Sequence, residues 1–198
     1  MSRTWSERAA LLAIALWAWL AMMLTHELGH VLAAWATGGA IVSVELRPGW
    51  LSHTLVRPNP APSTVLWGGF LCGWLAPLLS APWWRIERGL IGPALRAWTA
   101  FCWLAGGVYL AIGGGERLTD TGQLLLAGWP HWLLVVVGVV VAAVGFAASR
   151  RAWTAIDKRL EAEPLGWRAT AGWWLWLAVW IAGQGAAHGL LNGSLGQG

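Results

Sequence analysis

Apolar residues run almost unbroken through most of this chain, and short polar stretches separate the runs. Several runs approach or exceed the about 18–20 residues that a helix needs to cross a bilayer. Glycine, proline or charged residues end each run, as they commonly end helices. The predicted spans cover residues 9–37, 64–84, 94–112, 132–148 and 169–191. The pattern predicts an all-α membrane protein, a polytopic bundle of about five transmembrane helices.

The segment 40–57, between the first two spans, has a different period. From Val42 to Leu46 apolar and polar residues alternate, which is typical of a half-buried strand. Pro48 and Gly49 indicate a turn after which the chain can return as a second strand. We therefore expect a short membrane-associated β-hairpin after the first helix, with an exposed edge that could pair with an extended peptide. A plain amphipathic connector explains the alternation equally well.

Two further segments are too polar or too short to span. In 116–130, Thr119 is placed to cap a short helix with Asp120 in its first turn. In 149–168, apolar residues recur at helical spacing among basic ones, which predicts an interfacial helix over anionic headgroups. No stretch is long enough for a second, soluble domain, so residues 1–198 are expected to form a single transmembrane domain.

Composition agrees with a membrane location. The chain is 57% hydrophobic and 11% charged, whereas soluble domains carry about 25% charged residues. In a membrane protein, the net charge of +4 affects the orientation of the chain and its attraction to anionic lipid. We therefore expect the lipid bilayer as a partner and no nucleic acid. Most basic residues, Arg3, Arg8 and Arg150 among them, fall on the side of the N-terminus, which the positive-inside rule puts in the cytoplasm. No feature predicts an oligomeric state.

The first span contains His26-Glu27-Leu28-Gly29-His30. Histidines four residues apart project from one face of a helix, where two imidazoles can bind one zinc ion. Glu27 beside them can take a proton from a metal-bound water. Each charge at mid-bilayer costs about 2.5–3.5 kcal/mol on insertion scales. Ionisable residues in such a run are therefore candidates for a functional site.

A catalytic zinc ion needs a third protein ligand and an open position for water. Asp120 is one candidate, because two further crossings return the chain to the side on which the first span ends. His188 in the last span competes with it, since that span also ends on this side. His188 shares a helical stripe with Gln184 and Asn192. We expect His188, Gln184 and the hairpin residue His53 to be possible lining residues of a polar cavity.

The motif at 26–30, the strand-like segment after it and the segment 120–124 resemble the site-2 protease family of intramembrane zinc metalloproteases. The resemblance is closest to compact members without a PDZ domain. The segment 120–124 looks like the family's Leu-Asp-Gly motif, although Thr119 precedes the aspartate and Thr121 is inserted before the glycine. The resemblance implies Zn²⁺ on His26, His30 and Asp120, with Glu27 as general base. The implied activity is an endopeptidase that hydrolyses peptide bonds in or near transmembrane segments of membrane-protein or peptide substrates.

Non-enzymatic alternatives stay open. A non-catalytic zinc-binding membrane protein for metal transport or sensing explains the two histidines but gives Glu27 no task. A scaffold or regulator of other membrane proteins is the second alternative, and the intact motif argues against it. The small size, the absence of organelle signals and an N-terminus that reads as an uncleaved anchor favour a multi-pass protein of a bacterial plasma membrane.

Overall fold

The computed structural model describes residues 3–86 and 89–195 and is 78% helical. Helix α1 begins after Thr4, where a capping box satisfies the first turn: the Thr4 hydroxyl accepts from the Glu7 amide and the Glu7 carboxylate accepts from the Thr4 amide. The described helices are α1 (Trp5–Ala36), α2 (Pro62–Leu75), α3 (Ile91–Ile112), α4 (Asp120–Leu126), α5 (His131–Ala162) and α6 (Trp167–Leu195). The strands are β1 (Ile41–Glu45) and β2 (His53–Val56).

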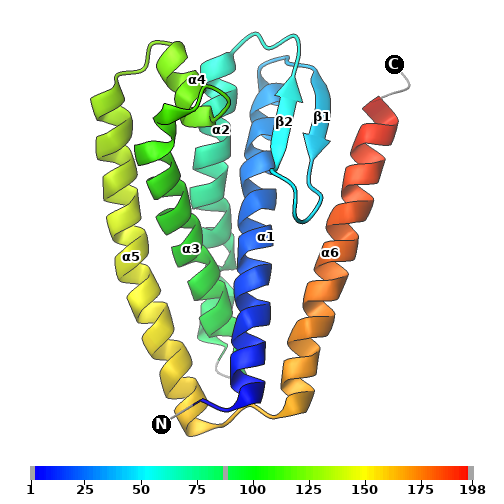
Figure 1. Cartoon of the computed structure of the whole chain (residues 1–198), viewed down its shortest axis with the longest axis vertical. Helices are drawn as coiled ribbons and strands as arrows, with labels where there is room; N and C mark the ends of the chain where they lie inside the picture. The colour runs from blue at the N-terminus through cyan, green and yellow to red at the C-terminus, as the bar shows by residue number, and fades with distance from the viewer. Residues whose placement is uncertain (1–2, 87–88, 196–198) are drawn as a thin grey trace.

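Four stretches within the described residues are long and apolar enough to cross a membrane, namely α1, 62–85, α3 with the turn after it, and α5. They make the chain a polytopic membrane protein, as the apolar runs predict. Helix α6 has 29 residues and runs beside α1 in the same bundle (Figure 1). It is not among the four candidate spans found within the described residues.

The long helices lie roughly side by side, and the hairpin and α4 occupy the end opposite to the start of α1 (Figure 1). Two helix pairs approach very closely through glycine. A Cβ on Gly29 of α1 would lie 2.1 Å from the carbonyl oxygen of Gly68 on α2, and a Cβ on Gly107 of α3 would lie 2.4 Å from the amide of Ala142 on α5. Small residues allow such approach in lipid, where backbone packing drives helix association.

Two helices differ from the prediction. The segment 149–168, predicted to form an interfacial helix after the fourth span, is helical to Ala162, but as a direct continuation of α5 from His131. No glycine or proline interrupts it after Gly145, and Ile156 and Leu160 are buried in the same apolar cluster as Trp17 of α1. The predicted span at 64–84 is α-helical only to Leu75, after which residues 76–85 form a 3₁₀ helix. Pro77 and Pro82 lack the amide hydrogens that an α-helix needs there.

The predicted hairpin is present. β1 and β2 pair antiparallel, with Val44 opposite Thr54 and Glu45 opposite His53. The hairpin turn points back along the bundle, so that both strands lie beside the upper halves of α1 and α6 (Figure 1). At Val44 the outer edge of β1 is not exposed as expected. The Asn192 side chain of α6 donates to the Val44 carbonyl (2.9 Å) and accepts from the Val44 amide (3.1 Å).

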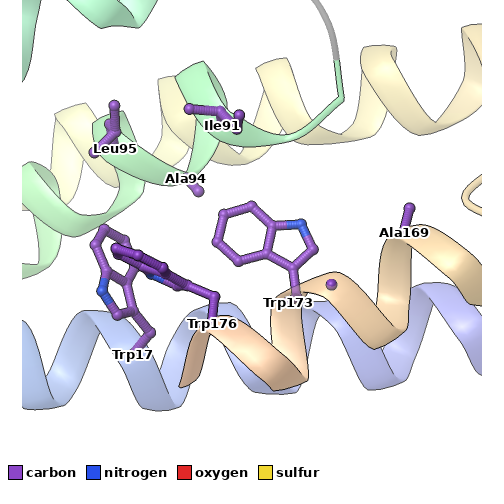
Figure 2. A pocket seen from close by; sticks show the side chains of 8 residues that line it. Trp17, Ile91, Ala94, Leu95, Ala169, Trp173 and Trp176 are labelled. Atoms are coloured by element: carbon purple, nitrogen blue, oxygen red, sulfur yellow. The ribbon is translucent and has the colours of Figure 1, made fainter. Parts of the chain in front are cut away.

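An aromatic cluster fills the opposite half of the bundle. The Trp17 ring lies 5.6 Å from that of Trp98, 6.4 Å from that of Trp173 and 5.9 Å from that of Trp180. Trp17 and Trp173 of this cluster also line an open, largely apolar cavity of about 460 Å³ between α1, α3 and α6 (Figure 2). Its lining residues are apolar or aromatic side chains, and the histidines of α1 are not among them.

Candidate metal centre

Three potential metal ligands converge at the upper end of the bundle. His26 Nε2 lies 2.8 Å from Asp120 Oδ2 and 3.1 Å from His30 Nε2, and His30 Nε2 lies 3.4 Å from Asp120 Oδ2. Tetrahedral zinc with bonds of about 2.0–2.1 Å keeps its ligand atoms about 3.3 Å apart. Two imidazole nitrogens and one carboxylate oxygen at these separations fit a zinc ion, and they leave a fourth position for water or substrate.

A hydrogen bond that His30 donates to α2 orients its ring. Its Nδ1 lies 2.8 Å from the carbonyl oxygen of Val65, and this bond requires Nδ1 to carry the proton. Nε2 then presents its lone pair towards Asp120. The ring of His26 meets Phe70 and Tyr109 nearly edge-on, with centroids 5.5 and 6.2 Å away. Such contacts hold ligand rings in place, as outer partners do in metal sites generally.

The seven-residue helix α4 carries Asp120 as its first residue. The predicted cap is confirmed: the Thr119 hydroxyl accepts from the Gly122 amide at 3.0 Å. Two bonds then attach α4 to α3, since the Asp120 amide donates to the Tyr109 hydroxyl (3.1 Å) and the buried Thr121 hydroxyl donates to the Tyr109 carbonyl (3.1 Å). The cap at Thr119 and the two bonds to Tyr109 of α3 therefore hold Asp120 in position.

The carboxylate of Glu27 lies next to the two histidines on α1 and is buried, with 2% of its surface exposed. Thr54 of β2 donates a hydrogen bond from its hydroxyl to Glu27 Oε2, at 2.7 Å. Thr54 and Tyr109 are not among the candidate residues predicted from the sequence. Tyr109 is the only tyrosine in the chain, which is the one signal that could have drawn attention to it.

The other candidate residues lie apart from this group. His188 Nδ1 donates to the Val44 carbonyl (3.0 Å) and lies 3.5 Å from the carboxylate of Glu45. Gln184 is buried and donates to the Leu20 carbonyl of α1 (3.1 Å). His53 is exposed on β2. Of the two proposed third ligands, Asp120 is the one that the fold places beside the histidine pair. The stripe on α6 faces β1 and α1 instead.

Comparison with protein-family models, with curated proteins and with solved structures finds no match to this chain. The resemblance to site-2 proteases therefore rests on the motif residues alone. Among them, His26 and Asp120 are 94 positions apart in the sequence, yet their side chains lie within hydrogen-bond distance.

Proposed function

We propose that this chain is an intramembrane zinc endopeptidase of the site-2 protease type, acting on peptide bonds in or near transmembrane segments of membrane proteins. One observation carries the proposal: ligand atoms of His26, His30 and Asp120 all lie within 4.8 Å of one another, beside the buried carboxylate of Glu27, on a helix apolar enough to span a membrane. Three protein ligands with one open position are typical of catalytic zinc, whereas structural zinc has four protein ligands.

The residues have separate tasks in this proposal. His26, His30 and Asp120 hold the metal. Zinc bound there supplies a Lewis acid that lowers the pKa of water towards about 7 and polarises the peptide carbonyl. Glu27 is not a ligand; it accepts the proton of the attacking water and passes it to the leaving amine.

The hairpin offers a strand edge near Glu27 on which a substrate peptide can bind. A peptide bond within a helix is shielded, so the substrate must unwind before hydrolysis. The amide and carbonyl of Val44 both point away from β2, towards Asn192. In an antiparallel ladder the opposite residue then points its backbone groups to the other edge. Thr54 is opposite Val44, so its amide and carbonyl face the free edge of β2, where an extended peptide can pair.

The membrane orientation follows from charge. Arg3, Arg8, Arg151 and Lys158 lie towards the end of the bundle where α1 begins and α5 ends. With that end in the cytoplasm of a bacterial cell, the chain obeys the positive-inside rule. His26 and His30 lie in the last third of α1, so the metal centre lies in the half of the bilayer that faces away from the cytoplasm.

Metal analysis of the purified protein beside a cleavage assay tests the proposal. The assay uses a panel of fluorescently labelled single-span fragments in lipid nanodiscs. We expect about one zinc per chain and cleavage of at least one fragment by the wild type. Glu27→Gln should keep the zinc and lose cleavage by about 10²–10⁴-fold. Glu161→Gln, an exposed glutamate on α5, is the matched control and should cleave normally.

Two results would overturn the proposal. Protein purified without zinc, and unable to bind it, removes the metal centre. Zinc-loaded wild type that cleaves no fragment, with Glu27→Gln indistinguishable from it, supports the non-catalytic zinc-binding alternative.

A further inference from the structure

The hairpin and the proposed base are joined by one hydrogen bond. The Thr54 hydroxyl on β2 donates to Glu27 Oε2 on α1 at 2.7 Å. Within residues 3–86 and 89–195, this hydroxyl is the single hydrogen-bond donor to the Glu27 carboxylate. A carboxylate that is only 2% exposed depends strongly on such a donor, since bonds to charged groups are roughly twice as strong as neutral ones.

We propose that Thr54 is the positioning residue for the general base: its hydroxyl holds Oε2, which leaves Oε1 as the oxygen that takes the proton from the attacking water. This inference rests on the proposed function. A glutamate side chain has three rotatable bonds, and one fixed oxygen removes most of that freedom. A displacement of about 1 Å in a catalytic group can cost about 10²-fold in rate, so a bond of this kind has a measurable effect on turnover.

The position of Thr54 is in turn set from α6. Thr54 is opposite Val44 in the sheet, and Asn192 and His188 of α6 hydrogen-bond to the backbone of Val44. The hydroxyl that faces Glu27 is thus located by a chain of contacts through β2, β1 and α6. A β-branched residue suits this place because its χ1 angle is restricted and it packs well in a strand.

Burial alone offers a simpler role, in which Thr54 only satisfies a carboxylate that would otherwise lack a partner. The two roles predict different kinetics. Loss of a merely structural bond lowers stability and the fraction of folded enzyme, and the folded remainder turns over normally. Loss of a positioning bond lowers kcat of the folded, zinc-loaded enzyme and leaves KM unchanged, because substrate binding does not use the base.

Two substitutions separate these roles. Thr54→Val keeps the branched shape and removes the donor, and Thr54→Ser keeps the donor. Ser43→Ala on β1 is the control for loss of a hydroxyl elsewhere in the hairpin. Cleavage is measured on the fragment that the wild type cuts, with rates divided by bound zinc. We expect Thr54→Val to lower kcat by about 10–100-fold at unchanged KM, which is about 1.4–2.7 kcal/mol. Thr54→Ser and Ser43→Ala should stay within about threefold of the wild type.

Infrared spectroscopy gives a readout that needs no turnover. The difference between wild type and Glu27→Gln isolates the carboxylate band of Glu27, in zinc-loaded and in metal-free protein. Thr54→Val should shift this band, and Thr54→Ser and Ser43→Ala should not. Two results would overturn the inference where the wild type is active. In the first, Thr54→Val leaves the Glu27 band unshifted; in the second, it shifts the band but keeps a normal kcat. Both results leave the proposed function standing. Wild type that binds zinc and cleaves nothing refutes the proposed function, and a shifted band then assigns the bond to burial alone.

Discussion

Gly69 of α2 faces His30 of α1 so closely that a Cβ on Gly69 would lie 2.5 Å from the Nε2 atom of the imidazole. The same Cβ would lie 2.9 Å from Cε1 of His26. The backbone of α2 therefore backs both rings and limits where they can turn. Glycine serves here for close approach, which is one of its usual roles in membrane helices.

Gly69→Ala should displace the histidine rings and weaken zinc binding by at least about 10–100-fold, the range seen when outer contacts of a metal site are lost. Alanine favours a helix more than glycine does, so the loss comes from the clash and not from the helix. Gly73→Ala is the control, because its Cβ would lie 3.9 Å from His26 Nδ1, an ordinary contact. Competition with a chromophoric chelator measures both affinities. Equal affinities for Gly69→Ala and wild type would contradict the packing.

The third ligand can be tested in the same assay. Asp120→Ala should lose tightly bound zinc, because Asp120 Oδ2 lies 2.8 Å from His26 Nε2 and supplies the only carboxylate of the three-residue group. His188→Ala should keep the zinc, since His188 donates to the Val44 carbonyl. Retention of the metal in Asp120→Ala together with its loss in His188→Ala would reverse the assignment.

Much of the fold can be predicted from local patterns. Apolar runs locate the long helices, and strict alternation after Val42 locates the hairpin. The capping role of Thr119 also follows from its position before Asp120. The boundary of α5 could not be predicted, because basic residues after Ser149 suggest a surface helix. Burial of Ile156 and Leu160 against α1 and α6 continues the helix, and that burial depends on tertiary packing.

The site divides in the same way. Spacing alone places His26 and His30 on one helical face, and counting membrane crossings brings Asp120 to the same end. Neither method finds Thr54, whose contact with Glu27 depends on the angle at which the hairpin folds back along α1. The stripe through His188 is visible in the sequence, but its target on β1 is not, because helix rotation is set by packing partners.

Glu45, which lies outside the proposed metal site, should make the stability of the fold depend on pH. Hydrogen bonds from the Arg47 guanidinium and amide lower the pKa of Glu45 to about 2, from 4.5. The pair therefore stabilises the fold above about pH 4.5, and that stability is lost as the pH falls towards about 2. Tryptophan-detected thermal unfolding should show a steeper loss of Tm on acidification for wild type than for Glu45→Gln. High salt should narrow the difference, because Arg47 is partly exposed. Parallel curves at low salt would contradict it.

Two exposed glycines report the orientation of the bundle. Gly115 lies just before α4, and Gly166 lies just before α6 at the opposite end. A Cβ at either position meets no atom within 4 Å, so cysteine fits both. In cells of a variant without Cys72 and Cys102, an impermeant maleimide should label Gly115→Cys from outside. Gly166→Cys should be labelled only after permeabilisation. The opposite result would invert the orientation.

The separation of 94 positions between His26 and Asp120 also sets the timing of assembly during biosynthesis. Helix α1 leaves the ribosome long before α4 exists, so its two imidazoles and Glu27 enter the membrane without Asp120 or Thr54. The hairpin, α2 and α3 must follow before the last ligand can dock. A newly made chain therefore cannot bring the three proposed ligands together before α4 has been translated. Under the proposed function, unfolded segments near the insertion machinery meet no assembled active site before that point.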